Sequence, residues 1–326
     1  MPDLPGGDPT TTERPGGRAR ARSSLLWLVL GLALVGIAMR VVARSPALDA
    51  GLDALRASPW WVFAGLLAFP LLNLLITSAT FQVLTGRYGR VGFAEMAALI
   101  AGAWLFSFVG MFGRIIYHRE IHGVPARASV LVLAQALGGS FVGVLLLLGL
   151  ALLAGAWRLD NASTAALLGG PVVFLAVISA AVRASSPGGH GWRWPAALLL
   201  RYLDMAVWAL RYLLLFSTLY GGVSVASAAG FAAAAQAAML VPIQVGLREW
   251  VIGLLGAGLA VAPQQSLGAS LGPGLLADLI NRLAELVIAL PLGVLATVWL
   301  ARRWHAHARR KSGRKPLPPL GRESVE

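Results

Sequence analysis

Charged side chains inside long apolar stretches are the residues of this sequence that could bind a ligand or carry protons. A charge near the middle of a membrane costs about 2.5 to 3.5 kcal/mol, so such residues are usually paired and functional. An arginine guanidinium presents a fork of N–H donors that matches the oxygens of a phosphate. We therefore expect an anion-binding pocket built by Arg211, Arg248 and Arg282. Its expected charge partners, or members of a proton relay, are Asp204, Glu249, Asp278 and Glu285.

The spacing of these residues places several of them on common helical faces, because residues three or four positions apart lie on one side of a helix. One such stripe consists of Arg201, Asp204, Trp208 and Arg211. A second consists of Asp278, Arg282 and Glu285. The alternative is that charges one turn apart only neutralise each other within their helix. Arg201 lies near a predicted helix end and is expected to extend to the membrane surface, so it is left out of the pocket.

A pair of histidines one helical turn apart points to a different chemistry, that of a zinc site. His118 and His122 have the spacing of an HExxH motif, but Arg119 stands where the motif needs its catalytic glutamate. A cation beside a metal ligand is unfavourable, and the motif lacks a third ligand. The chain has no cysteine, which excludes thiolate metal sites and disulfides. We expect no metal and no cofactor.

Two acidic residues between the first two apolar stretches form an alternative catalytic site. Asp49 and Asp53 lie in a predicted external loop, where polyprenol-dependent membrane glycosyltransferases carry acidic catalytic residues. The other interpretation is that these carboxylates balance Arg44 and Arg56. The sequence has no P-loop and no GxGxxG dinucleotide fingerprint, so ATP-driven transport by this chain is not expected.

The composition indicates that membrane helices must position these residues. Of 326 residues, 57% are hydrophobic and 13% are charged, whereas a soluble domain carries roughly 25% charge. Ordinary soluble enzymes and disordered proteins are therefore excluded. Apolar runs of about 20 residues, the length that crosses a bilayer, recur along the chain. The predicted apolar segments are 25–42, 61–84, 94–112, 127–156, 163–183, 196–220, 224–240, 247–260 and 275–300.

Basic residues at the two ends predict the orientation of the chain. Residues 1–24 form a basic tail expected to be disordered, residues 25–300 the transmembrane domain, and residues 301–326 a second basic tail. By the positive-inside rule both tails are cytoplasmic, and we expect them to face anionic lipid rather than nucleic acid. Arginine dominates over lysine in an alanine- and glycine-rich background, which indicates a GC-rich bacterial genome and hence a bacterial inner membrane.

Two regions are predicted to dip into the membrane and return, because nine crossings would put the two tails on opposite sides. Residues 94–112 would enter from the cytoplasm, and the pair 224–240 and 247–260 from outside. The expected fold is all-α, with six crossings, two re-entrant helical hairpins from opposite faces and an inverted repeat. Arg114 would meet the anion at the cytoplasmic hairpin. The predicted turn residues are Gly110, Gly113, Pro242 and Gly246.

The second turn region resembles the signature of a known family. It is similar to the Pro-Gly-Gly-Leu-Gly-x-Arg-Glu element of the lysylphosphatidylglycerol synthase transmembrane-domain family, also called the flippase-like domain family. The residues that carry this resemblance are Pro242, Gly246, Arg248 and Glu249. Ile243 and Gln244 stand in place of the paired glycines. Further matches, to the family's closing helix and its Pro-Gly-Arg element, are Arg282, Pro291, Gly113 and Arg114.

The resemblance covers roughly residues 25–300 and implies a flippase-like protein. Such a protein would bind or translocate an anionic phospholipid or a polyprenyl-phosphate-linked lipid between leaflets. Because a short tail follows Trp299 instead of an aminoacyltransferase domain, lipid aminoacylation is not expected. The expected partners are an anionic membrane lipid and a separate envelope-lipid enzyme. Two alternatives stay open, a membrane glycosyltransferase with a polyprenyl-linked donor and a non-catalytic envelope scaffold.

Overall fold

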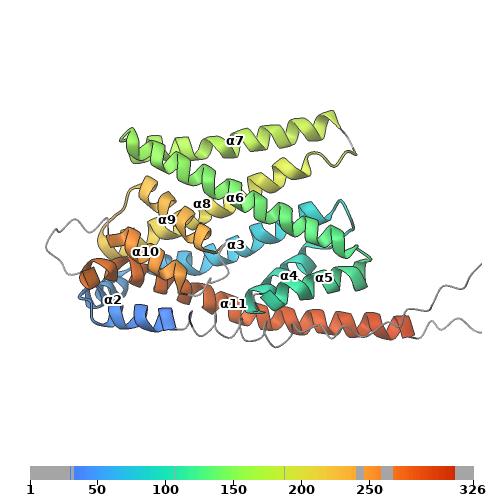
Figure 1. The fold of residues 1–326 in the computed structure, drawn as a ribbon, viewed down its shortest axis with the longest axis horizontal. Helices are drawn as coiled ribbons and strands as arrows, with labels where there is room; N and C mark the ends of the chain where they lie inside the picture. Colours follow the sequence, from blue (N-terminus) through green and yellow to red (C-terminus); the bar gives the residue numbers. More distant parts are fainter. Residues whose placement is uncertain are drawn as a thin grey trace, which may run out of the picture.

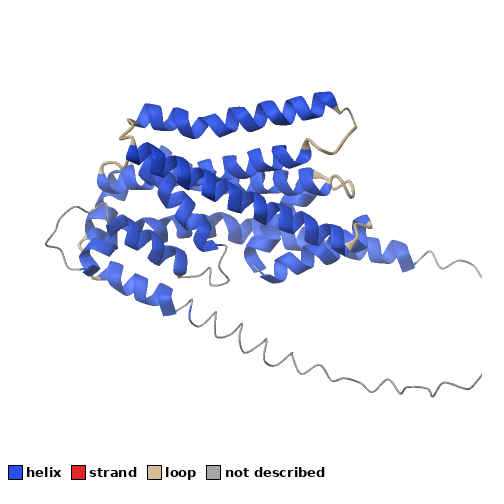
Figure 2. Cartoon of the chain, turned by 45° about the horizontal axis from the view of Figure 1, so that its top comes forward, coloured by secondary structure: helices blue, strands red, loops and turns tan. Residues whose placement is uncertain are grey.

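The computed structural model describes residues 30, 33–106, 108–186, 188–239, 246–257 and 267–312, and every regular element in these ranges is a helix (Figures 1 and 2). The all-α expectation is confirmed for this part of the chain. A first helix covers Ala33–Ala43. The others are α2 (Ala47–Ala57), α3 (Trp60–Thr85), α4 (Phe93–Phe106), α5 (Phe108–His122), α6 (Ala126–Ala156), α7 (Asn161–Ser185), α8 (Arg193–Tyr220), α9 (Val225–Met239), α10 (Leu247–Ala257) and α11 (Leu267–Ser312).

Four of the described helices are long and apolar enough to cross a membrane. They are α3, α6, α7 and the Leu271–Arg310 part of α11. Helices α8 and α9 pass the same test only together, and they are bent by 119° at the break between them. The described chain thus has four candidate spans, or five if the bent pair is one span, as expected for a polytopic membrane protein.

The helices begin and end at residues that favour these boundaries. Asp160 precedes α7, and its Oδ1 accepts a 2.7 Å hydrogen bond from the backbone N–H of Ser163, a standard N-cap. Pro125 stands directly before α6, where its missing N–H costs nothing. Helix α8 ends at Gly221, whose φ of 78° lies in the left-handed region that glycine adopts without strain. These residues mark where α6 and α7 start and where α8 stops.

Helix α8 is the centre of the bundle. It packs against α3 on one side and against α6, α7 and α9 on the others, while α11 packs against α10, α4 and α3 (Figure 1). Its inward face buries a row of large rings that includes Tyr202, Trp208, Tyr212 and Phe216. Helix α7 lies at the edge of the molecule, and Thr164 is its one fully covered residue. An apolar helix this exposed needs lipid around it.

Helices α10 and α11 approach each other closely because glycines face one another between them. A Cβ atom at Gly256 would lie 2.8 Å from the Cα atom of Gly274, so no larger residue fits there. Small residues at such contacts allow two membrane helices to pack backbone to backbone. This contact helps to bring Arg248, at the start of α10, beside Asp278 and Glu285 of α11.

Two regions differ from the segments expected from the sequence. Residues 43–60, expected to be a loop, contain α2, whose apolar and polar residues alternate with helical spacing. The segment 94–112 divides into α4 and the beginning of α5, two short helices that pack against each other. Helix α11 also continues to Ser312, beyond the expected end of the last apolar segment.

Candidate functional site

The charged stripe on α8 faces the interior of the bundle, as its spacing predicts. Asp204, Trp208 and Arg211 are all buried. Arg201 was expected to reach the membrane surface, and this expectation is wrong. Its side chain is 11% exposed, and its Nη1 lies 3.2 Å from Asp204 Oδ2. A carboxylate one turn away satisfies Arg201 better than an extended conformation would.

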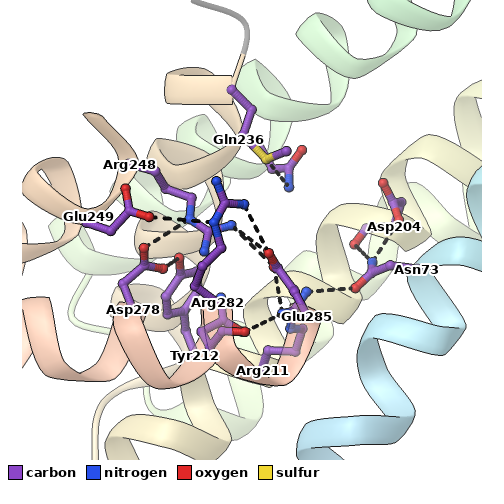
Figure 3. Close-up of polar contacts among 12 residues, drawn as sticks. Asn73, Asp204, Arg211, Tyr212, Gln236, Arg248, Glu249, Asp278, Arg282 and Glu285 are labelled. Atoms are coloured by element: carbon purple, nitrogen blue, oxygen red, sulfur yellow. Dashed lines mark hydrogen bonds and ion pairs between the residues drawn. The ribbon is translucent and has the colours of Figure 1, made fainter. Parts of the chain in front are cut away.

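The three arginines of the expected pocket do converge, and they meet at Glu285 (Figure 3). Arg211 Nη2 lies 2.7 Å from Glu285 Oε1. Arg248 Nη1 lies 3.2 Å, and Arg282 Nη1 3.3 Å, from Glu285 Oε2. One carboxylate thus serves three guanidinium groups that come from α8, α10 and α11.

Two further carboxylates complete this group. Arg248 Nε donates to Asp278 Oδ2 at 2.9 Å, and the hydroxyl of Tyr212 donates to Asp278 Oδ1 at 2.7 Å. Arg282 Nε lies 3.7 Å from Glu249 Oε1. Asp278 therefore pairs across helices with Arg248 rather than along α11 with Arg282. We call the whole set the central cluster, namely Arg211, Tyr212, Arg248, Glu249, Asp278, Arg282 and Glu285.

Asn73 on α3 joins the central cluster to the Arg201–Asp204 pair. Its Nδ2 donates to Asp204 Oδ1 at 2.7 Å, and its Oδ1 accepts from Arg211 Nη1 at 3.3 Å. Fixed donors and acceptors of this kind hold buried charges in one arrangement. The charged residues of α8, α10 and α11 thus form one connected network with α3.

Arg248 and Glu249 lie in the first turn of α10, where unpaired backbone N–H groups and the positive end of the helix dipole favour an anion. Gly246 stands just before this turn with a φ of 89°, a conformation that suits glycine. Its predicted place at the turn agrees with this geometry. Pro242, the other predicted turn residue here, lies outside the described residues.

Several buried polar atoms of this region have no hydrogen-bond partner among the described residues. They are Arg248 Nη2, Glu249 Oε2, and both the nitrogen and the oxygen of the Asn281 amide. Buried polar atoms are rarely left unpaired, so such a group indicates a place for water, an ion or a ligand. Arg282, with 27% of its side chain exposed, forms the open side of the cluster.

The formal charges of the central cluster balance, with three guanidinium groups against three carboxylates. Trp208 adds an aromatic face, since its ring centroid lies 4.2 Å from Arg211 Cζ and 5.2 Å from Arg248 Cζ. Mutual neutralisation alone would produce this balance. It does not by itself explain the four unpaired atoms.

Arg114 does not join the central cluster. It is buried on α5, with its Cζ 3.9 Å from the ring centroid of Phe81 on α3. Gly110 and Gly113, predicted as turn residues, lie within α5. Position 107, between α4 and α5, lies outside the described residues.

The other candidate sites look structural. Asp53 Oδ1 lies 3.0 Å from Arg56 Nη1 on the surface of α2, which agrees with charge balance. The ring centroids of His118 and His122 are 6.1 Å apart. No group of three His, Cys, Asp or Glu residues that could hold a metal exists in the described ranges.

Tyr212 is the member of the central cluster that the sequence analysis missed. A tyrosine in an apolar helix is ordinarily a core residue. The signal was present, because Tyr212 follows Trp208 by four positions and so continues the charged stripe.

An apolar groove of about 690 Å³ lies between α6, α9 and α10. Its lining includes Leu148, Leu152, Phe231 and Leu255. Phe231 also stacks on Phe216, with ring centroids 4.6 Å apart. A lining of this kind suits an alkyl chain rather than a charged group.

Comparison with known proteins adds no relative: no family model, no curated protein and no solved structure matches this chain.

Proposed function

We propose that this protein is a flippase-like integral membrane protein that binds the anionic head group of a lipid and moves it between leaflets. The lipid would be a phospholipid or a polyprenyl-phosphate-linked lipid. The observation that carries the proposal is the meeting of Arg211, Arg248 and Arg282 at Glu285 among membrane helices, beside buried polar atoms with no partner. Buried charges of this kind in membrane helices are usually functional.

In this proposal the lipid phosphate replaces Glu285. The three arginines that share this carboxylate could instead donate to phosphate oxygens, which accept the guanidinium fork in the same way. Arg282 would make the first contact, because it is the most exposed member of the cluster. Asp278 would remain on Arg248, held by the hydroxyl of Tyr212.

Proton transfer would accompany this exchange. An anion added to a balanced cluster leaves one negative charge in excess, which is costly away from water. Protonation of the released Glu285 would remove that excess, as buried carboxylates without a cation favour their neutral form. The carboxylates would then act as charge partners and as a proton relay.

The membrane arrangement that we propose has six crossings and two re-entrant hairpins from opposite faces, with both termini cytoplasmic in a bacterial inner membrane. Two pairs of short helices support it, α4 with α5 and α9 with α10, since each pair packs together. The resemblance of the α10 start to the lysylphosphatidylglycerol synthase transmembrane-domain family supports the same arrangement. Many transporters also place broken helices at matching positions of two inverted repeats. The lipid's alkyl chain would lie in the apolar groove.

The test is a leaflet-resolved translocation assay in proteoliposomes that contain fluorescent phosphatidylglycerol. Arg282→Gln removes a charged donor that is worth about 1.5 to 3 kcal/mol, so translocation should fall at least about tenfold. Arg56→Gln is the matched control, because this arginine is 76% exposed on α2 and pairs with Asp53 rather than with a residue of the cluster. It should translocate lipid at the wild-type rate.

Arg248→Lys extends the test to the centre of the cluster. It keeps the charge that Asp278 needs but loses the guanidinium fork, so the fold should survive while translocation falls. If Arg248→Lys and Arg282→Gln both translocate lipid as the wild type does, the cluster is structural and the proposal is wrong. Loss of a lipid-dependent activity in Asp49→Asn alone would favour a glycosyltransferase instead.

A further inference from the structure

A second group of buried cations lies apart from the central cluster, between α3, α5 and α8. Arg114 of α5 and Arg201 of α8 both approach the ring of Phe81 on α3. The distances from Cζ to the ring centroid are 3.9 Å for Arg114 and 5.8 Å for Arg201. Two like charges therefore flank one aromatic ring in the interior of the protein.

This group lacks the charge balance of the central cluster. Arg201 has Asp204 as its carboxylate partner and a 3.3 Å hydrogen bond to Thr77 Oγ1, yet its Nε has no partner. Arg114 donates to no acceptor and pairs with no carboxylate within the described ranges. Of these two arginines, Arg201 alone has a carboxylate partner within the described ranges, and that carboxylate also accepts a hydrogen bond from Asn73. A buried charge without a partner is costly, so it favours an anion that can join it.

His118 adds a third unsatisfied group. It follows Arg114 by four residues and so lies on the same face of α5. It is buried, and its Nδ1 has no hydrogen-bond partner in the part of the chain that the structure describes. One small region therefore contains unpaired nitrogens of Arg201 and His118 together with Arg114, which has no carboxylate partner in the described ranges.

The position of this group relative to the central cluster is set by α8. Arg201 and Arg211 lie on the same stripe and are ten residues apart, which corresponds to about 15 Å along the helix. Arg193 lies on that stripe at the other end, and its Nε also lacks a partner among the described residues. Guanidinium groups thus follow one face of α8 from its beginning to the central cluster.

We propose that Arg114, Arg201 and His118 form a second anion site that receives a phosphate monoester or diester before the central cluster does. The inference rests on the proposed function, since it makes this site the first of two positions on the path of the head group. Its chemistry would also accept free phosphate, so the test separates the two sources.

The test counts lipids bound to the purified full-length protein by native mass spectrometry. The probes are dioctanoyl phosphatidylglycerol, dioctanoylglycerol as a lipid without phosphate, and inorganic phosphate as a competitor. Arg114→Gln should weaken phosphatidylglycerol binding to this site about tenfold, the loss of one charged hydrogen-bond donor. Arg119→Gln on the same helix is the matched control, because this arginine is 69% exposed.

Thermal unfolding of Arg114→Gln separates binding from structure. Because Arg114 has no carboxylate partner within the described ranges, and glutamine can still pack on the ring of Phe81, its neutralisation should leave the melting temperature unchanged or raise it. A lower melting temperature, wild-type binding by Arg114→Gln, or equal binding of dioctanoylglycerol would each overturn the site. Competition by inorganic phosphate would assign it to phosphate anions in general, and its absence to lipid phosphates; either result supports an anion site.

The same variants distinguish this inference from the proposed function. If Arg282→Gln abolishes translocation while Arg114→Gln binds and translocates as the wild type does, the second site is wrong and the function stands. If Arg114→Gln loses one bound lipid while the wild-type protein translocates none, the site stands and the function is wrong.

Discussion

Asn281 is fully buried on α11 between Asp278 and Arg282, yet neither atom of its amide has a partner among the described residues. An unpaired buried amide lowers stability by about 1 to 3 kcal/mol. A ligand or water that hydrogen-bonds to this amide would remove the cost, so Asn281 is expected to line a binding site. Asn281 is thus the residue at which stability and function should respond in opposite directions.

Asn281→Leu tests this opposition. Leucine has a similar volume and no polar atoms, so the unfolding temperature of the purified protein should stay the same or rise. Lipid translocation in proteoliposomes should fall, because the polar lining of the central cluster is lost. A large drop in the unfolding temperature would show instead that Asn281 stabilises the fold through contacts of its own.

His118 predicts an acid-sensitive step in stability. Burial, with help from the positive charge of Arg114 and from His122, lowers its pKa from 6.5 to about 4. Since the folded pKa is the lower one, the stability contribution is complete above about pH 6.5 and declines as the pH falls toward 4. Glu95 acts in the opposite direction on His118, but too weakly to reverse the shift.

We expect the melting temperature of the wild type to fall more steeply between pH 6.5 and pH 4 than that of His118→Gln. The glutamine variant cannot take up the proton, while the contact of His122 with Glu95, 3.1 Å between Nε2 and Oε1, is the same in both proteins. Parallel melting curves across this range would contradict a neutral, buried His118.

Among the helices, those with long apolar runs were predicted most accurately. The segments 61–84, 127–156 and 163–183 correspond closely to α3, α6 and α7, because the ends of a long hydrophobic run are unambiguous. Helix α2 was missed, since a short amphipathic helix has no such run. The stripe on α8 was also correct, because its spacing depends on one helix alone.

Contacts between helices could not be predicted in the same way. Helical spacing alone suggested, as the alternative interpretation, that Asp278 pairs with Arg282 one turn away, whereas Asp278 binds Arg248, thirty residues earlier in the chain. That choice depends on how closely α10 approaches α11, which the glycines Gly256 and Gly274 permit. Spacing along one helix carries no information about such an approach.

Gly256→Ala tests the role of this close helix contact. The added Cβ would lie 2.8 Å from Gly274 Cα, so α10 must move away from α11 and the Arg248–Asp278 pair must lengthen. We expect a lower melting temperature and less lipid binding. Gly149→Ala on α6 is the control, because its Cβ would meet nothing within 4 Å and alanine favours a helix. Equal behaviour of the two variants would contradict the proposed contact.

Seen as a whole, the protein separates two uses of positive charge. The formal net charge is +13, while the central cluster is balanced. Much of the excess falls in the two terminal tails, where the positive-inside rule uses it to orient the chain. The buried arginines of the helices are instead paired with carboxylates, or lie beside unpaired polar atoms, as binding requires.

The orientation of the whole chain can be tested directly, because the protein contains no cysteine and each introduced thiol is the only one. Four exposed residues are each changed to cysteine in a separate variant, namely Arg56, Arg119, Trp157 and Arg302. With six crossings and two re-entrant hairpins, a membrane-impermeant maleimide should label positions 56 and 157 in intact cells. Positions 119 and 302 should react only after permeabilisation.

Position 119 is the decisive one. It lies in the last turn of α5, so it stays on the cytoplasmic side only if the α4–α5 pair turns back within the membrane. Labelling of position 119 from outside would mean that the pair crosses, and the first hairpin would be wrong. Labelling of position 302 from outside would reverse the C-terminal end and remove the even number of crossings. Cytoplasmic labelling of both, with 56 and 157 outside, would place the second anion site on the side from which the basic tails attract anionic lipid.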